Sequence, residues 1–594
     1  MTKAVLEAES EGVVRRTVAA VPSPALPVPA SLHASLMARL DRLGPAKEVA
    51  QIGAAIGREF SHALLASVVR KPEAELGSAL NRVVEAGLLF RQGVPPHATY
   101  LFKHALVQDA AYSTLLRERA LHARIADVLE SQFTEIAESQ PELLAHHCTE
   151  AGLIEKAADL WGTAGQRSLA CSALVEATAQ LTRALDQIAA LPASPALRRE
   201  QIKLQIGLAI ALTHTKGAAL PETMASLDQA RSLIERAEAL GEPPEDPLLL
   251  FSVLSGLWAA SQITFNGDVT PELAAQFLAL AEKQGATLPL LNGHRMMGLS
   301  LMFTGDIARG RAHLDRAVAL YDPMERCAPA MPFGVDPGVL ALSYRSRALW
   351  LLGYPEAALV DADRALVDAR KVGHLATLMQ VLVVSSAIHR YCGDYAAANA
   401  RLDELDAVAD EKVGLGSHWK AFGTWNRGYV LALTGEASNA VQMMSAGIAA
   451  SRSTGSTIME AESLSSLAKA YAELDQFDDA RRCIGEAMTA VETTKERLYE
   501  AEVYRTVGEI TLLSPESDVE KAEAHFERAL AVARQQQAKS WELRAAMSMA
   551  RLRRDQGKRQ EAHDLLAPVY SWFTEGFDTL DLKEAKALLE RLKP

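Results

Sequence analysis

The sequence predicts an all-α protein, an α-solenoid built from helical hairpins and preceded by a small domain that contains a short sheet. Three observations support this prediction. The chain of 594 residues is too long for one hydrophobic core. Hydrophobic residues make up 49% of it but aromatic residues only 6%, so its apolar content is mostly Ala, Leu and Val, as in closely packed helices. A pattern of small and apolar residues also recurs about every 40 residues.

Composition argues against several classes of partner. Lys and Arg total 61 against 74 for Asp and Glu, and the net charge of −13 repels a phosphate backbone, so we expect no nucleic-acid partner. The five cysteines have no metal-ligand spacing, which is typical of a reducing compartment. No stretch reaches the roughly 18 apolar residues of a membrane span, and no signal peptide is recognisable. We therefore expect a cytoplasmic protein without membrane insertion.

The N-terminal part divides at a proline-rich segment. Residues 21–29 read VPSPALPVP, and repeated prolines prevent a helix and favour an extended linker. We interpret residues 1–29 as the remnant of a preceding domain and this linker. Residues 30–132 contain three helical patterns, two candidate strands at 88–91 and 99–103, and a further helix. This order predicts a winged-helix domain.

A winged helix raises the question of DNA binding, which depends on the charge of one helix. The helix expected at 72–86 carries Glu73, Glu75 and Glu85 against Arg82. Such a surface lacks the basic side chains that contact phosphates. We therefore expect this helix to serve packing.

The repeat is defined by a small anchor residue that stands five positions after a turn residue. Seven anchors follow one another at spacings of 40 to 48 residues: Gly310, Ala358, Ala398, Ala440, Ala480, Ala522 and Ala562. The positions four and seven residues after every anchor are apolar or glycine, and the position twelve before it is small in six cases of seven. Small residues let two antiparallel helices approach, and the larger apolar residues fill the neighbouring groove.

These offsets match the tetratricopeptide pattern, with a period of about 40 instead of about 34 residues. The same offsets hold around Ala157 and Ala177, whose close spacing indicates one helix shared by two hairpins. We assign 291–594 to tetratricopeptide-like repeats and 133–290 to divergent helical repeats. The register is undefined between 191 and 291.

Five segments are more specific than the repeat pattern of small and apolar residues requires. They are PASLHASLMARLDRL at 29–43, AAIGREF at 54–60, FKHALVQDAAY at 102–112, QAKSWELRAA at 537–546 and WFTEGFDTLDLKEA at 572–585. Together they resemble the C-terminal half of the bacterial class III adenylate/guanylate cyclase proteins. In these proteins a cyclase domain is followed by a signal-transduction ATPase of the STAND type and then by tetratricopeptide repeats. The resemblance spans nearly the whole chain.

The sequence departs from that family in the parts that carry catalysis. It contains no G-x-x-x-x-G-K-[ST] phosphate loop and no counterpart of the cyclase segment. We therefore expect no enzymatic activity, no catalytic residue and no cofactor. We interpret the chain as a truncated or split product of such a gene, a hypothesis that the DNA sequence upstream of its start codon would test. The resemblance then implies that residues 1–29 are the remnant of the ATPase lid with the proline-rich linker, and that residues 30–132 are a winged helix of the STAND type.

His104 is the one residue that the resemblance offers for a nucleotide. In the STAND family the winged helix closes over the nucleotide in the resting state, and a histidine in that domain can contact the ADP phosphates. His104 opens the helix after the predicted strands. The alternative, which the missing phosphate loop favours, is a residue at the start of a helix with a structural hydrogen bond.

The sequence His146-His147-Cys148 suggests a metal site only superficially. Adjacent residues on a helix point about 100° apart, and we expect that they do not converge on one ion. We therefore expect these side chains to pack and the chain to hold no metal.

A set of aromatic and arginine residues provides the candidate binding site. Phe422, Trp425 and Tyr429 share one face of the first helix of a hairpin, at positions that line the concave groove in tetratricopeptide arrays. Concave positions of the two preceding repeats hold Arg347, Trp350, Arg390 and Tyr391. Both residue types anchor interfaces, so the set predicts a groove for a peptide or protein. The alternative is that these rings pack between long helices.

Three functions remain open from the sequence. The first is a non-catalytic signalling module whose solenoid senses a protein or small ligand. The second is the regulatory part of an adenylate or guanylate cyclase that is supplied in the same product or by a partner chain. The third is a MalT-like transcription regulator. Such regulators end in a DNA-binding helix-turn-helix, whereas residues 585–594 continue the repeat-like helix.

Overall fold

The computed structural model describes residues 30–115, 118–171, 173–242, 248–322, 334–410 and 417–593. The predicted remnant at 1–29 lies outside this part of the chain. Two compact units are present, one ending at Ala157 and the other beginning at Ala158.

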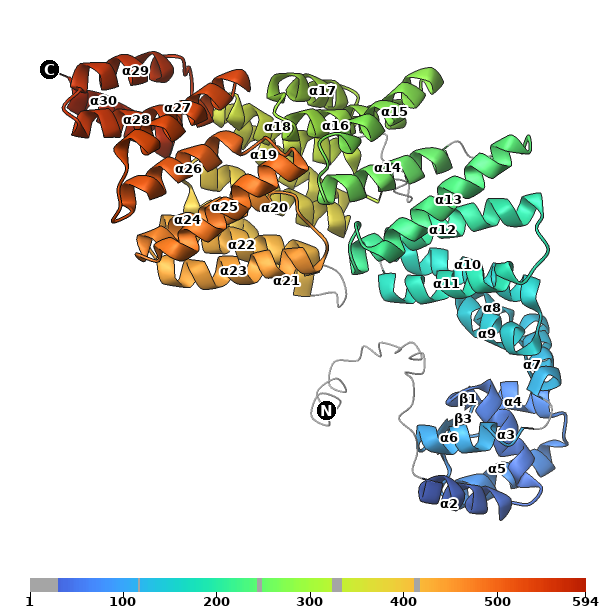
Figure 1. The fold of residues 1–594 in the computed structure, drawn as a ribbon. Coiled ribbons are helices and arrows are strands. Elements are labelled where there is room, and N and C mark those ends of the chain that lie inside the picture. The colour runs from blue at the N-terminus through green and yellow to red at the C-terminus, as the bar shows by residue number, and fades with distance from the viewer. Residues whose placement is uncertain are drawn as a thin grey trace. The chain divides into compact units, whose positions relative to one another are not determined.

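The first unit contains eight described helices and a small sheet (Figure 1). The helices are α2 (Ala30–Asp41), α3 (Ala46–Ile56), α4 (His62–Val69), α5 (Glu73–Glu85), α6 (Ala105–Tyr112), α7 (Glu118–Gln132), α8 (Thr134–Ser139) and α9 (Pro141–Ala151). The strands β1 (Glu59–Ser61), β2 (Leu89–Gln92) and β3 (Thr99–Phe102) form an antiparallel sheet in the order β1-β3-β2.

The sheet contains both predicted strands and one that the sequence did not reveal. Leu89 pairs with Phe102 and Gln92 with Thr99 across β2 and β3. The additional strand β1 has three residues, too few for a visible alternation of apolar and polar side chains. Its central Phe60 lies against the rings of Tyr100 and Phe102 at centroid distances of 5.8 and 5.9 Å. The β1 strand therefore helps to form the core of this unit.

The second unit is an array of helices that begins within α10. These helices are α10 (Ile154–Ala170), α11 (Leu174–Ala189), α12 (Pro195–Thr215), α13 (Pro221–Ala239), α14 (Leu248–Ile263), α15 (Val269–Gln284), α16 (Thr287–Phe303), α17 (Ile307–Ala319), α18 (Pro337–Leu351), α19 (Pro355–Val372), α20 (Leu375–Tyr391), α21 (Tyr395–Asp410), α22 (Ser417–Leu433), α23 (Ala437–Ser453), α24 (Glu460–Glu473), α25 (Phe477–Thr494), α26 (Glu500–Leu513), α27 (Val519–Gln535), α28 (Lys539–Asp555), α29 (Arg559–Ser571) and α30 (Leu580–Leu592). From α16 to α29 they pair as consecutive hairpins, and α30 packs on the last one.

The anchors occupy the positions that the sequence assigned to them. Each of the seven lies in the second helix of a hairpin, from α17 to α29, and is buried. A Cβ atom added to Gly298 on α16 would lie 2.7 Å from Leu314 Cγ and 3.0 Å from the carbonyl oxygen of Gly310 on α17. The two helices therefore approach too closely for a larger residue. The predicted all-α solenoid of tetratricopeptide type is confirmed.

The segment with no readable register is also helical. Helices α12 and α13 have 21 and 19 residues and pack as a hairpin. Gly256 on α14 lies against Leu227 on α13, so close approach at glycine continues here outside the repeat offsets. None of the described helices is long and apolar enough to cross a membrane.

Candidate functional site

The residues predicted to line the groove come from the first helices of three consecutive hairpins. Helix α18 carries Arg347 and Trp350, α20 carries Arg390 and Tyr391, and α22 carries Phe422, Trp425 and Tyr429. All of them are buried except Tyr429, which is half-buried. The exposed fractions of Arg347 and Arg390 are only 2% and 3%. The structure thus places most of this set inside the array.

Aromatic stacking joins the beginning and the end of the repeat region. Tyr391 stacks on Trp350 with ring centroids 4.4 Å apart and an interplanar angle of 21°. Trp541 of α28 lies edge-on to Trp350 at 4.8 Å, and its indole nitrogen donates a hydrogen bond to the carbonyl oxygen of Leu498 at 3.1 Å. The Ser540 hydroxyl donates to the carbonyl oxygen of Trp350. Helices α18 and α28, far apart in the sequence, are therefore in contact.

Arg390 is the centre of the polar part of this site. Its guanidinium lies 4.0 Å from the ring centroid of Tyr429, 4.5 Å from that of Tyr391 and 5.7 Å from that of Trp425. Its Nη2 donates a hydrogen bond to Glu462 Oε1 at 3.0 Å, and the Tyr391 hydroxyl donates to the same oxygen at 2.7 Å. Burial raises the pKa of Tyr391 above its ordinary value, so the hydroxyl stays protonated as a donor.

A second arginine and a second glutamate lie beside this pair. Arg347 Nη1 lies 3.7 Å from the sulfur of Met459. Glu496 Oε2 accepts a hydrogen bond from the backbone N–H of Met459 at 2.9 Å. Burial raises the pKa of Glu496 to about 8, so this carboxyl holds a proton at neutral pH.

Several buried polar atoms in this region have no hydrogen-bond partner among the described residues. They are Arg347 Nε, Arg390 Nε, Trp425 Nε1, Glu462 Oε2 and Glu496 Oε1. An unpaired buried donor or acceptor costs about 1–3 kcal/mol. Both donors and acceptors in the interior are thus available to a bound molecule or to water.

A small cavity opens next to Trp425. Phe422 and Trp425 of α22, Ile448 and Ser451 of α23, and Met459 before α24 are among its lining residues. Its volume of about 20 Å³ has room for one or two water molecules. The cavity and the cluster share Trp425 and Met459, which makes them parts of one site.

Sequence reasoning missed several residues of this site, among them Met459, Glu462, Glu496, Tyr499, Trp541 and Arg544. The hydroxyl oxygens of Tyr391 and Tyr499 lie 3.2 Å apart, and the Arg544 guanidinium lies 5.1 Å from the ring centroid of Trp350. Two of the missed residues carry a signal, because Glu462 and Arg544 stand eighteen residues before the anchors Ala480 and Ala562, as Phe422 stands before Ala440. Trp541 and Tyr499 have no such signal. Their place depends on contact between helices of distant repeats, which the repeat pattern does not encode.

His104 lies at the N-terminal end of α6. It occupies the N-cap position and is exposed, and its side chain makes no capping hydrogen bond. Its carbonyl oxygen accepts from the backbone N–H of Val107 at 3.0 Å. His104 therefore contributes its backbone carbonyl group, and not its imidazole, to the hydrogen bonds at the start of α6.

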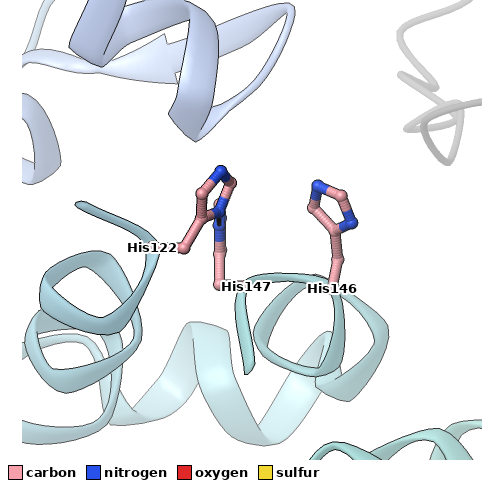
Figure 2. Close-up of side chains that lie close together, drawn as sticks. All are labelled: His122, His146 and His147. Carbon is pink, nitrogen blue, oxygen red and sulfur yellow. Dashed lines mark hydrogen bonds between the residues drawn. The ribbon is translucent and has the colours of Figure 1, made fainter. Parts of the chain in front are cut away.

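The two adjacent histidines on α9 differ from the sequence expectation. Ring nitrogens of His146 and His147 lie within 4.8 Å of each other and of His122 on α7 (Figure 2). A rotation of 100° about the helix separates the Cβ atoms, but the two side-chain torsions of each histidine bring the rings back together. Burial lowers the pKa of His122 to about 4 and holds that of His147 well below its ordinary value. The expectation that these side chains do not converge is therefore wrong.

Comparison with known proteins gives the following likenesses. No family model matches the chain. An uncharacterized protein of Rhizobium meliloti (strain 1021) is 27% identical over 382 residues, which are 63% of this chain and 35% of that protein. The chain thus spans about a third of the length of this relative.

Two solved structures are similar at low sequence identity. A Rap protein complexed with competence and sporulation factor is 13% identical, with a TM-score of 0.44, and the match covers 66% of this chain and 100% of that one. A STAND protein with a tetratricopeptide-repeat sensor from Pyrococcus horikoshii is 11% identical, with a TM-score of 0.29, and the match covers 96% of this chain and 68% of that one.

Proposed function

We propose that the chain is a non-catalytic sensor that binds a peptide or a protein segment inside its helical array. One observation carries the proposal. The interior combines stacked aromatic rings with buried donors and acceptors that have no hydrogen-bond partner in the described part of the chain, notably Arg347 Nε, Arg390 Nε and Glu462 Oε2. A peptide offers both acceptors and donors along its backbone and apolar side chains for the rings, so it matches this mixture.

The size of the cavity adds a condition to the proposal. A volume of about 20 Å³ beside Trp425 does not hold a peptide. Binding therefore requires the first helices to separate, and the ligand shifts the array toward an open state for which it has the higher affinity. The Arg390–Glu462 pair would then exchange its internal contacts for contacts with the ligand. This change in the array is the signal that we propose the chain transmits.

The test is a search for peptides with a variant that leaves the fold intact. A random peptide display library is selected on the immobilised full chain, and the enriched peptides are measured by fluorescence polarisation. Arg347→Met keeps the length of the side chain and removes a buried guanidinium, whose Nη1 lies 3.7 Å from the sulfur of Met459 and which forms no ion pair with the carboxylates that the structure describes. We expect it to weaken binding at least about tenfold, the equivalent of one charged hydrogen bond.

A matched control comes from the outer surface of the array. Arg481 on α25 is exposed and pairs only with exposed Asp478 among the described residues. Arg481→Met should leave peptide affinity unchanged. If the enriched peptides bind both variants and the parent chain equally, the interior is not the binding site.

We further propose that the chain corresponds to the winged-helix and repeat region of a cyclase–STAND signalling protein, with residues 30–132, 133–290 and 291–594 as its three parts. The five segments that resemble this family support the proposal, as does the β2–β3 ribbon that follows α5. The chain would then regulate a cyclase or ATPase domain in the same or a partner chain.

Nucleotide binding tests whether this chain only regulates, while another domain or chain carries the nucleotide site. Because the sequence has no phosphate loop, we expect equilibrium dialysis of the full chain with ATP or ADP to show no binding, and His104→Ala to change nothing. Cyclase turnover or nucleotide binding by the isolated chain would contradict the non-catalytic assignment.

A further inference from the structure

Three histidines of the first unit bring their ring nitrogens together at one point. His122 projects from α7, and His146 and His147 project from α9, which packs along α7. One nitrogen of each lies within 4.8 Å of the others. Figure 2 shows the three rings standing on the same side of the two helices. His122 and His147 are buried, whereas His146 is exposed.

The spacing of these nitrogens is close to that of a metal site. Zinc binds histidine nitrogens at about 2.0–2.1 Å, so two ligands of a tetrahedral ion lie roughly 3.3 Å apart. The Nδ1 atoms of His122 and His147 are 2.9 Å apart. This pair needs to open by a few tenths of an ångström. His146, whose side chain is exposed, needs a torsional change that moves its nitrogen by up to roughly 1.5 Å.

The hydrogen bonds around the cluster favour an ion between the rings. With no ion, the two Nδ1 atoms at 2.9 Å share one proton, and the buried Nε2 of His147 has no partner among the described residues. On the other side, the Tyr112 hydroxyl lies 3.1 Å from Nε2 of His122. When Nδ1 binds a metal, Nε2 carries the proton and donates it to such an oxygen, which fixes the tautomer and the orientation of the ring.

We propose that His122, His146 and His147 form a binding site for one divalent first-row transition ion, in the first place zinc. Three imidazoles without a carboxylate suit such ions and do not suit magnesium or calcium, which require oxygen ligands. The fourth position lies on the side of exposed His146, where water or a ligand atom from another molecule completes the tetrahedron. The ion links α7 to α9.

Zinc titration of the full, untagged chain tests the proposal. The chain is stripped with a chelator, exchanged into metal-free buffer, and titrated with zinc chloride against a chromophoric competitor. We expect one ion per chain and, after titration with cobalt chloride, the visible absorption of four-coordinate cobalt. We also expect zinc to raise the thermal unfolding midpoint of the chain, because the ion binds the folded form.

The variants separate a built site from scattered surface histidines. His146→Ala removes an exposed ligand, so the metal-free chain should keep its unfolding midpoint while its zinc affinity falls at least about tenfold. Tyr112→Phe should lower the affinity by roughly tenfold or more through the lost partner of His122. The control is His313→Ala, because His294 and His313 have an Nδ1–Nδ1 distance of 3.0 Å but form only a pair. It should leave the zinc affinity unchanged.

The opposite results would overturn the proposal. Zinc binding of equal strength in the parent chain and in His146→Ala would show that the cluster is not the site. Absence of stoichiometric binding by the folded parent chain would show that His122 and His147 are only a hydrogen-bonded pair. Neither outcome bears on peptide binding, which belongs to the second unit.

Discussion

Arg390 donates a hydrogen bond to Glu462 over 3.0 Å, although the two residues are 72 positions apart and almost completely buried. The bond ties α20 to α24, the first helices of two hairpins that are not consecutive. Buried ion pairs contribute little net stability compared with apolar residues, but removal of one partner leaves an uncompensated charge. The pair therefore determines the relative position of α20 and α24 but adds little to the free energy of unfolding.

Replacement of this carboxylate should be costly. We expect Glu462→Gln to lower the free energy of unfolding of the second unit by about 3–5 kcal/mol, because the Arg390 charge remains buried without a counter-charge. Tryptophan fluorescence in a urea titration measures this loss of stability, since all seven tryptophans lie in the second unit. Asp479→Ala, which breaks an exposed pair with Arg482, should cost less than about 1 kcal/mol. Equal costs would mean that the pair is solvated.

The buried carboxyl of Glu496 should make stability depend on pH. Its pKa is about 8 in the folded chain against an ordinary 4.5, so between these values the folded state binds more protons than the unfolded state. Stability from this group is thus present below pH 4.5 and is lost as the pH rises toward 8. Glu496→Gln keeps an acceptor for the N–H of Met459 and removes the titration.

We therefore expect the stability of Glu496→Gln relative to the parent chain to increase from pH 5 to pH 8. Urea unfolding at a series of pH values measures this difference. A difference that stays constant over this range would show that Glu496 does not titrate in it.

Close helix approach predicts opposite effects of one substitution at two glycines. A Cβ at Gly428 would lie 2.9 Å from the backbone nitrogen of Met444, so Gly428→Ala should destabilise the second unit by about 1–3 kcal/mol. Gly485 on α25 has no atom within 4 Å of such a Cβ, and Gly485→Ala should stabilise by about 0.5–1 kcal/mol. Thermal unfolding of both variants provides the comparison, and a shift of the same sign in both would contradict the packing argument.

The ring cluster at the end of the array should be as sensitive as a hydrophobic core. Trp541 is almost fully buried and lies against Trp350 and Tyr391. Trp541→Ala should cost about 3–5 kcal/mol, measured by circular dichroism in a urea titration. Trp572 is 38% exposed, and Trp572→Ala should cost clearly less. A Trp541 variant with nearly parental stability would mean that α18 and α28 separate freely.

The repeat architecture could be predicted because it depends on local spacing. An anchor such as Ala440 must be small for its hairpin to close, and this requirement repeats along the sequence. The contacts of Trp541 with Trp350 could not be predicted, because the curvature that brings α28 to α18 is the sum of small rotations at every hairpin. The convergence of His122 with His147 was likewise hidden, since it depends on the packing of α7 on α9 and on side-chain torsions.

The candidate binding site was accessible to sequence reasoning only in part. Repeat positions identified Arg390 and Trp425 as neighbours on the concave side, but Arg390 is buried against Glu462 of a later repeat. A single helix face does not show what covers it.

The contact between Ser540 and Trp350 joins residues 190 positions apart and has a consequence for cooperativity. In a linear repeat protein each hairpin interacts only with its neighbours, so unfolding can begin at one end and spread stepwise. Here the hairpin of α28 and α29 also covers Trp350 and Tyr391 near the start of the region. Loss of that hairpin would expose a distant core as well as an adjacent one. The repeats from α18 to α29 should therefore unfold in one cooperative step, because contacts between the first and last of these hairpins couple them.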